Sequence, residues 1–129
     1  MKRARITKAE FDIHENFVIV RYDEGSNVTV EDWKEIMKVL LDNFSGKFAW
    51  ISDRINSYSI DPTLLLETEV IEDMNNYIIC LAQVNYEQKL KDSTELAKDF
   101  LSANVPFRSF KKLDDALNWV NEKLRDIGT

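Results

Sequence analysis

Two segments near the start of the chain have the pattern of paired strands. In residues 7–13 apolar and polar side chains alternate strictly, which is typical of a strand with one face in water. A denser apolar segment, FVIVRY at residues 17–22, follows after a short polar turn. We therefore predict an opening antiparallel hairpin. Its first strand would turn one set of side chains inward (Thr7, Ala9, Phe11 and Ile13) and the other set outward (Lys8, Glu10, Asp12 and His14).

Two predicted helices follow the hairpin. Thr29 and Asp32 have the spacing of a capping box, and an apolar stripe at helical spacing then extends to Phe44. After the short apolar strand FAWIS, residues 48–52, Asp61 is suited to be an N-cap and Pro62 to be the first helical residue. The second helix would direct its apolar side chains inward, namely Leu66, Val70, Ile71 and Met74.

The second half of the chain alternates strands with helices. The segment YIICLAQV, residues 77–84, is apolar almost throughout, which is typical of a central strand buried on both faces. We predict a helix at residues 92–104, an edge strand at residues 105–110, and a final helix with an apolar stripe from Leu113 to Leu124. The order ββαβαβαβα indicates one α/β domain over residues 1–129, with a mostly parallel mixed sheet, an opening hairpin and flanking helices.

Composition and charge limit the classes of partner. The 129 residues are 44% hydrophobic and 31% charged, as in a compact globular protein. A net charge of -6 disfavours binding to nucleic acid and to anionic membranes, and the short basic segment MKRAR at the N-terminus is a local exception. The longest apolar segment is too short to span a bilayer, and Cys80 within it is expected to be a buried, reduced thiol. We expect a cytoplasmic protein without stable membrane insertion.

A segment near the C-terminus, FRSFKKLDDALNWV, suggests a family. It places a phenylalanine, an acidic pair, an alanine and a tryptophan at Phe110, Asp114, Asp115, Ala116 and Trp119. Together with the element order, this segment resembles the STAS domain, and within it the SpoIIAA-like group of small bacterial proteins. The resemblance covers nearly the whole chain in element order, and it implies a non-enzymatic regulatory or protein-binding domain.

The resemblance also directs attention to one loop. In the anti-sigma-factor antagonists, a partner kinase phosphorylates a serine at the start of the helix after the third strand, within an Asp-Ser-Ser-Gly pattern. This chain has DPTL at the matching residues 61–64, so Asp61 is retained and Thr63 stands at the second serine position. Ser57 and Ser59 lie just upstream. A phosphate on any of the three hydroxyl residues would be electrostatically favoured near a helix N-terminus.

A second candidate site lies where the parallel strands end. Ligands of open α/β sheets tend to bind beyond the carboxyl ends of the strands. That rule predicts a polar pocket formed by Asp53, Arg54, Gln83, Asn85 and Tyr86. The structural alternative is that Asp53 and Arg54 form a surface ion pair and that the amides stabilise turns.

Residues that would carry catalysis or bind a metal are few. His14 falls on the polar side of a strand, and it is far in sequence from Cys80, so no metal-binding spacing is recognised and no cofactor is predicted. The acidic pairs fall at helix starts or on outer helix faces, and they form no convincing acid–base pair. Tyr58 stands between two loop serines, where its ring would either pack in the core or anchor a contact.

These patterns favour binding over catalysis. Our first hypothesis is a protein partner that binds residues 56–63 and the start of the following helix, with Ser57, Tyr58, Ser59, Asp61 and Thr63 as its candidate contacts. The second is a small-ligand or lipid-binding domain with a cavity between the sheet and the helices, and the third is a small enzyme. The sequence leaves the identity of the partner and the oligomeric state open, a homodimer included.

Overall fold

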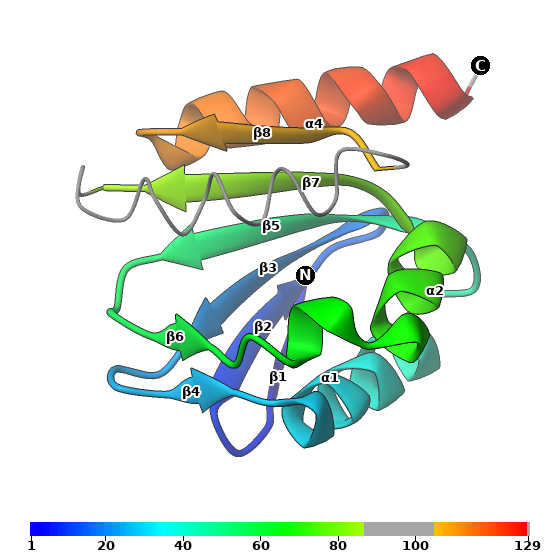
Figure 1. Cartoon of the computed structure of the whole chain (residues 1–129). Coiled ribbons are helices and arrows are strands. Elements are labelled where there is room, and N and C mark those ends of the chain that lie inside the picture. The colour runs from blue at the N-terminus through cyan, green and yellow to red at the C-terminus, as the bar shows by residue number, and fades with distance from the viewer. Residues whose placement is uncertain (87–104, 129) are drawn as a thin grey trace.

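The computed structural model describes residues 1–86 and 105–128, and in this part of the chain a main sheet has the strand order β1-β2-β3-β5-β7-β8 (Figure 1). A parallel pair, β4 and β6, lies beside it. The strand bounds are Lys2–Arg5 (β1), Ala9–Ile13 (β2), Phe17–Tyr22 (β3), Asn27–Val28 (β4), Phe48–Arg54 (β5), Ser59–Ile60 (β6), Ile78–Asn85 (β7) and Phe107–Phe110 (β8).

Strand directions agree with the prediction from the sequence. The hairpin of β2 and β3 is antiparallel, while β3, β5, β7 and β8 run parallel to one another. The strand β1 was not predicted, because its residues are mostly charged and carry no apolar alternation. It forms because Ala4 pairs with Phe11 of β2 and packs against the apolar core.

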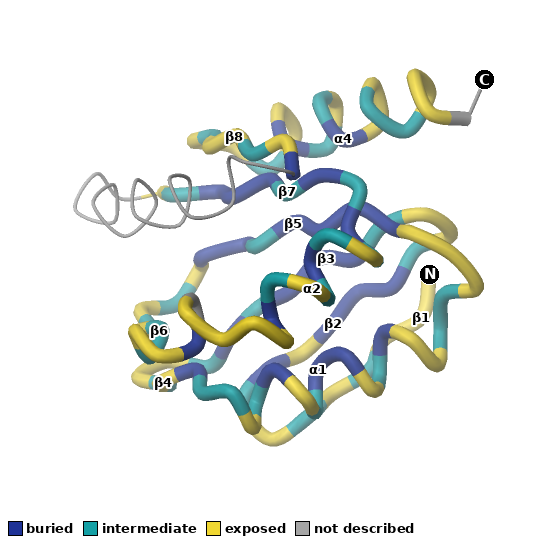
Figure 2. Tube along the Cα trace, turned by 45° about the vertical axis from the view of Figure 1, so that its right-hand side comes forward, coloured by how far each residue is buried: buried dark blue, intermediate teal, exposed yellow. Residues whose placement is uncertain are grey.

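Helices cover the two faces of the sheet separately. Helices α1 (Val30–Asn43) and α2 (Thr68–Tyr77) lie on one face, and α4 (Leu113–Gly128) lies on the other (Figures 1 and 2). The first core includes Phe11, Trp33 and Trp50, and the second includes Ile51 and Val120. Figure 2 shows the buried central strands between these two layers.

Helix α1 begins where the sequence predicts. The Thr29 hydroxyl accepts a hydrogen bond from the Asp32 backbone amide, and the Asp32 carboxylate accepts one from the Thr29 amide at 2.9 Å. This reciprocal capping box satisfies amides that would otherwise have no partner at the helix start. Lys8 donates a further hydrogen bond to Asp32 at 2.9 Å, so the same carboxylate also ties the helix to the hairpin.

The start of the second helix was predicted wrongly. Residues Leu64–Leu66 form a short 3-10 turn, Glu67 is extended (φ -73, ψ 126), and the α-helix begins only at Thr68. This break rotates the apolar stripe, so Leu66 is 75% exposed while Val70 and Met74 are buried as predicted.

The third predicted helix, at residues 92–104, lies outside the described residues. The edge strand and the final helix are confirmed as β8 and α4. None of the helices in residues 1–86 and 105–128 is long and apolar enough to cross a bilayer.

Candidate functional site

The alternation of side chains divides the predicted strand-end pocket between the two faces of the sheet. Asp53 and Arg54 are neighbours on β5 and therefore point to opposite faces. Asp53 lies with Tyr86 on the α4 side, and Arg54 lies on the side of α1 and α2, where Gln83 also points. Asn85 pairs with Arg54 in the β5–β7 register. The structure thus places the five residues in two separate groups.

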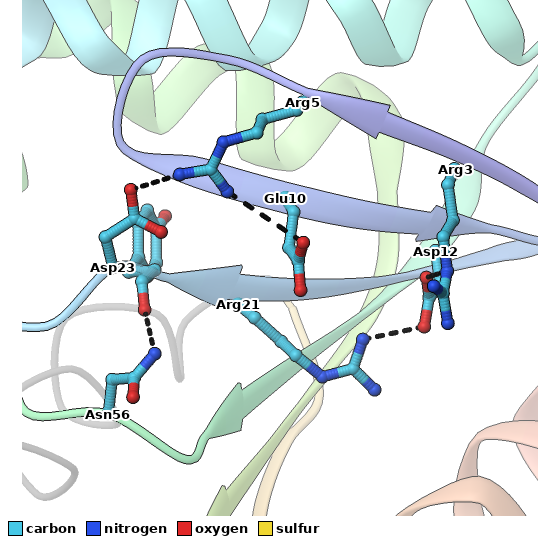
Figure 3. A network of polar contacts seen from close by, with 8 residues as sticks. Arg3, Arg5, Glu10, Asp12, Arg21, Asp23 and Asn56 are labelled. Carbon is cyan, nitrogen blue, oxygen red and sulfur yellow. Dashed lines mark hydrogen bonds and ion pairs between the residues drawn. The ribbon is translucent and has the colours of Figure 1, made fainter.

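The group on the α4 side is a network of ion pairs across four strands. Arg21 donates to Asp12 at 2.6 Å through Nη1 and to Asp53 at 2.9 Å through Nε. At its outer end Arg3 reaches Asp12 at 3.2 Å, and at its inner end the Tyr86 hydroxyl donates to Asp53 at 2.7 Å. Figure 3 shows the outer part of this network on β1, β2 and β3.

The pKa shifts in this network show that its charges support one another. Burial raises the pKa of Asp12, but the hydrogen bond and charge of Arg21 and the charge of Arg3 outweigh it, so the net pKa is below the ordinary value. Burial lowers the pKa of Arg21, and the hydrogen bonds to Asp12 and Asp53 outweigh that effect and raise it. Burial and the hydrogen bond to Asp53 raise the pKa of Tyr86 to about 12. The network links side chains of β1, β2, β3 and β5 on this face of the sheet.

On the opposite face, Tyr58 is the centre of a partly polar cluster. Its ring lies 4.6 Å from the Tyr22 ring between centroids, and the Arg54 guanidinium carbon lies 4.5 Å from the Tyr58 ring centroid. Burial raises the pKa of Tyr58, while the charge of Arg54 and a hydrogen bond from Gln83 lower it by less. Tyr58 therefore packs inward with the core, which answers the question that its loop position raised.

Two polar side chains in this cluster are almost fully buried. Arg54 is 4% exposed and Gln83 is 5% exposed. In the described part of the chain, neither Nε of Arg54 nor Oε1 of Gln83 has a hydrogen-bond partner. Because a buried polar atom without a partner costs stability, such atoms often mark a place where something else binds.

A small cavity of about 70 Å³ lies next to this cluster, between the sheet and helices α1 and α2. Its wall is mostly aromatic and aliphatic, and Ser52, Tyr58 and Gln83 are among its polar residues. The other described lining residues are Tyr22, Val28, Trp33, Trp50, Ile60, Leu64, Met74, Ile78, Leu81 and Phe107.

Residues 56–63 form a loop, called the 56–63 loop below. Hydrogen bonds hold it to the rest of the chain at several points. Gly25, at φ 76, donates its backbone amide to the Ser57 carbonyl at 2.7 Å. The Ser57 amide donates to the Glu24 carboxylate at 2.6 Å. The side chain of Asn56, labelled in Figure 3, donates to the Tyr22 carbonyl at 3.0 Å. The loop is therefore fixed in position from within the chain.

The side chains of the 56–63 loop separate into inner and outer sets. Ser57, Ser59 and Thr63 are exposed, whereas Tyr58 is turned inward. The Ser59 hydroxyl donates to Asn27 at 2.9 Å, and the Thr63 amide donates to the Asp61 carboxylate at 3.0 Å. Asp61 thus stabilises the turn before the short 3-10 segment and does not cap an α-helix.

This geometry bears on the phosphorylation hypothesis. A phosphate on Ser57 would lie near the Glu24 carboxylate, and one on Thr63 would lie near Asp61. Both would meet repulsion between like charges, and α2 begins well beyond them at Thr68. Of the three hydroxyl residues, Ser59 is the one whose described side-chain contact is with a neutral group, Asn27.

Sequence reasoning did not single out Asp12, Arg21 and Tyr22 as parts of these clusters. Arg21 carried a usable signal, since a charged residue inside the apolar segment FVIVRY requires a partner when its strand is central.

His14, predicted on the polar side, stacks on Phe17 with ring centroids 4.3 Å apart. Cys80 is buried, and burial raises the pKa of its thiol to about 11. No group of three or more metal-ligating side chains is found in the described ranges.

The sheet order, the opening hairpin and the separation of α1 and α2 from α4 define a SpoIIAA-like α/β fold. The structure is similar to the crystal structure of an uncharacterized protein of the DUF3478 family with a SpoIIAA-like fold, from Shewanella loihica PV-4. The two share 13% sequence identity with a TM-score of 0.60, over 87% of this chain and 91% of the other. No protein-family model matches the sequence, and no curated protein matches it. The resemblance drawn from the sequence is confirmed at the level of the fold.

Proposed function

We propose that this STAS-like domain works by binding a protein partner, without chemical turnover, through the outer side of the 56–63 loop. The observation that carries this proposal is the fixed loop geometry, which displays Ser57, Ser59 and Thr63 outward while Tyr58 holds the loop from beneath. A surface that is already ordered loses little conformational entropy when a partner binds.

Exposed apolar side chains at both ends of this loop support the same surface. Ile55 directly precedes the loop and is 56% exposed, and Leu66 follows it shortly afterwards. Large apolar side chains that remain exposed next to ordered polar groups are a common composition at protein interfaces. The domain would act as a regulator if its binding prevented the partner from contacting another molecule.

The test is affinity capture from the native host with variants that alter only exposed positions. Ser57→Arg and Thr63→Arg should each reduce recovery of a specific partner at least tenfold, because a long cation replaces a small contact side chain. Ser45→Arg, at an exposed position after α1, is the matched control and should recover the partner as the wild type does. Equal recovery with all three variants would reject the loop as the binding surface.

A second candidate function is the binding of a small ligand in the cavity beneath the loop. It is supported by the mostly apolar lining of this cavity. Native mass spectrometry of gently purified protein tests it. A retained small molecule supports the ligand function, and a bare polypeptide mass under conditions that preserve other weak complexes counts against it.

A further inference from the structure

Strand β8 ends the main sheet, and in the described part of the chain no further strand lies on its outer side. The Leu81 amide of β7 donates to the Pro106 carbonyl at 2.9 Å, and Leu81 pairs with Phe107 in a parallel register. Successive residues of a strand direct their N–H and C=O groups to opposite sides, so this register turns Arg108 toward β7 and Phe107 and Ser109 outward. Backbone groups at such an edge can pair with another strand.

Four basic side chains gather around this edge, namely Arg108 of β8, Lys111 and Lys112 directly after it, and Lys123 of α4. In residues 1–86 and 105–128, none of the four is part of an ion pair. The Arg108 guanidinium carbon lies 5.2 Å from the Phe110 ring centroid, and Lys123 Nζ lies 5.7 Å from the Trp119 ring centroid. A guanidinium over a ring face keeps N–H donors at its own edge for an anion.

The cations at the opposite edge of the sheet are in a different state. On β1, Arg3 pairs with Asp12, and Arg5 pairs with both Glu10 and Asp23. Acidic side chains of this chain therefore already neutralise the β1 edge. Near β8, the acidic pair at residues 114–115 lies in the first turn of α4, where the helix N-terminus favours negative charge. The unpaired cations of β8 are thus a local positive surface on a chain of net charge -6, and such a surface favours an acidic partner.

The charges also distinguish between possible occupants of the β8 edge. A second copy of this chain, paired through its own β8, would bring Arg108 and Lys111 of one copy close to the same cations of the other, which is destabilising. Nucleic acid would contact the cations but leave the outward amides and carbonyls of Phe107 and Ser109 unpaired, and the net negative charge of the chain opposes it. An extended acidic peptide matches both the cations and the backbone groups.

From these observations we infer that the outer edge of β8 binds an extended acidic segment of a partner protein, which adds to the main sheet as a further strand. Phe107 and Ser109 form the backbone hydrogen bonds, and Arg108 pairs with an acidic side chain of the added strand. This edge is separate from the 56–63 loop, whose strand β6 pairs with β4 outside the main sheet (Figure 1). The inference therefore goes beyond the proposed function and does not depend on it.

The test is an NMR titration of the full chain with a short capped peptide in which Glu and Thr alternate. At saturation, hydrogen exchange of the Phe107 and Ser109 amides should slow by at least about tenfold, because both become hydrogen-bonded. The Arg108 amide, which already faces β7, should change little. Two further peptides carry N-methyl groups on one or the other set of alternate amides. One of the two should lose binding, because only one set can face β8.

Charge variants test the role of the cations. Arg108→Glu should weaken binding of the Glu–Thr peptide by at least about tenfold, and Lys111→Glu is a second variant at an exposed position. Arg125→Glu, in the last turn of α4, makes the same change of charge and is the matched control, which should bind as the wild type does. Unchanged binding of both N-methylated peptides would overturn strand addition. Absent binding of the Glu–Thr peptide, or tighter binding of single-stranded oligothymidylate, would overturn the acidic segment as the occupant.

Discussion

The guanidinium of Arg54 lies 4.5 Å from the ring centroid of Tyr58, and this contact joins the end of strand β5 to the underside of the 56–63 loop. Arg54 is nearly fully buried, so the face of the Tyr58 ring supplies part of the electrostatic support that water would otherwise give. The loop that displays Ser57 and Ser59 is therefore positioned by a side chain of the central sheet.

Removal of the Tyr58 ring should destabilise the fold much more than removal of its hydroxyl. Tyr58→Phe keeps both ring contacts and loses only the hydroxyl, so we expect a loss of at most about 1.5 kcal/mol. Tyr58→Ala leaves a void and a buried guanidinium without its ring, and should cost about 2–4 kcal/mol. Urea unfolding of both variants measures the difference, and equal losses would show that the ring does not support the loop.

Arg21 should be the most costly arginine to remove from the ion-pair network. Arg21→Met leaves Asp12 and Asp53 without their shared cation in a mostly buried place, and should cost about 2–4 kcal/mol. Arg3→Met is the matched control, because the Arg3 side chain is 78% exposed and surface pairs contribute at most about 1 kcal/mol. Similar unfolding midpoints for the two variants would contradict a structural role of the network.

The same network should make stability depend on acid pH. The folded-state pKa of Asp12 lies below the ordinary value of 3.8, so its stabilising effect is complete above that value and is lost as the pH falls through the folded-state pKa. The wild-type protein should therefore lose stability as the pH falls below 3.8 and through the folded-state pKa of this group. Asp12→Asn, although less stable at pH 7, should show a shallower decline. An unchanged slope would argue against the coupling to Arg21.

The structure predicts opposite effects for two leucines of the turn before α2. Leu64 is 3% exposed and packs in the first core, whereas Leu66 is largely exposed to water. Leu64→Lys should cost about 3 kcal/mol or more, because it places a charge in the core, while Leu66→Lys should change stability by less than about 0.5 kcal/mol. Thermal unfolding of both variants checks this. A large loss of stability for Leu66→Lys would contradict the exposed position of Leu66 and would favour the continuous helix predicted from the sequence.

The fold was predictable to the extent that apolar pattern determines burial. The capping box at Thr29 and the central strand β7 have clear signals, and the structure confirms them. The alternation in residues 7–13 is confirmed in part: the strand begins only at Ala9, Thr7 is exposed, and Asp12 is buried because Arg21 pairs with it on that face. The strand β1 and the pair β4 and β6 have none, because long-range backbone pairing forms them instead of a pattern of their own. The break at Glu67 was likewise hidden, since helical spacing continues in the sequence across it.

The sequence drew attention to the strand ends and to Tyr58, but it did not reveal how their side chains are arranged. The strand-end rule brought attention to Asp53 and Arg54, yet only the strand register shows that they lie on opposite faces. Inward packing of Tyr58 could not be derived either, because it depends on Tyr22, which is distant in sequence. Pairs of this kind are set by tertiary structure, so a single sequence does not reveal them.

Photo-crosslinking from the 56–63 loop tests the proposed partner surface most directly. A photoreactive phenylalanine analogue placed at Ser57 or, in a separate variant, at Ser45 would be irradiated in the native host, and the adducts would be compared by mass. We expect a specific protein adduct from position 57 and none from position 45, because the first position lies on the proposed surface and the second lies beyond α1. An adduct from position 45 with none from position 57 would contradict the proposal.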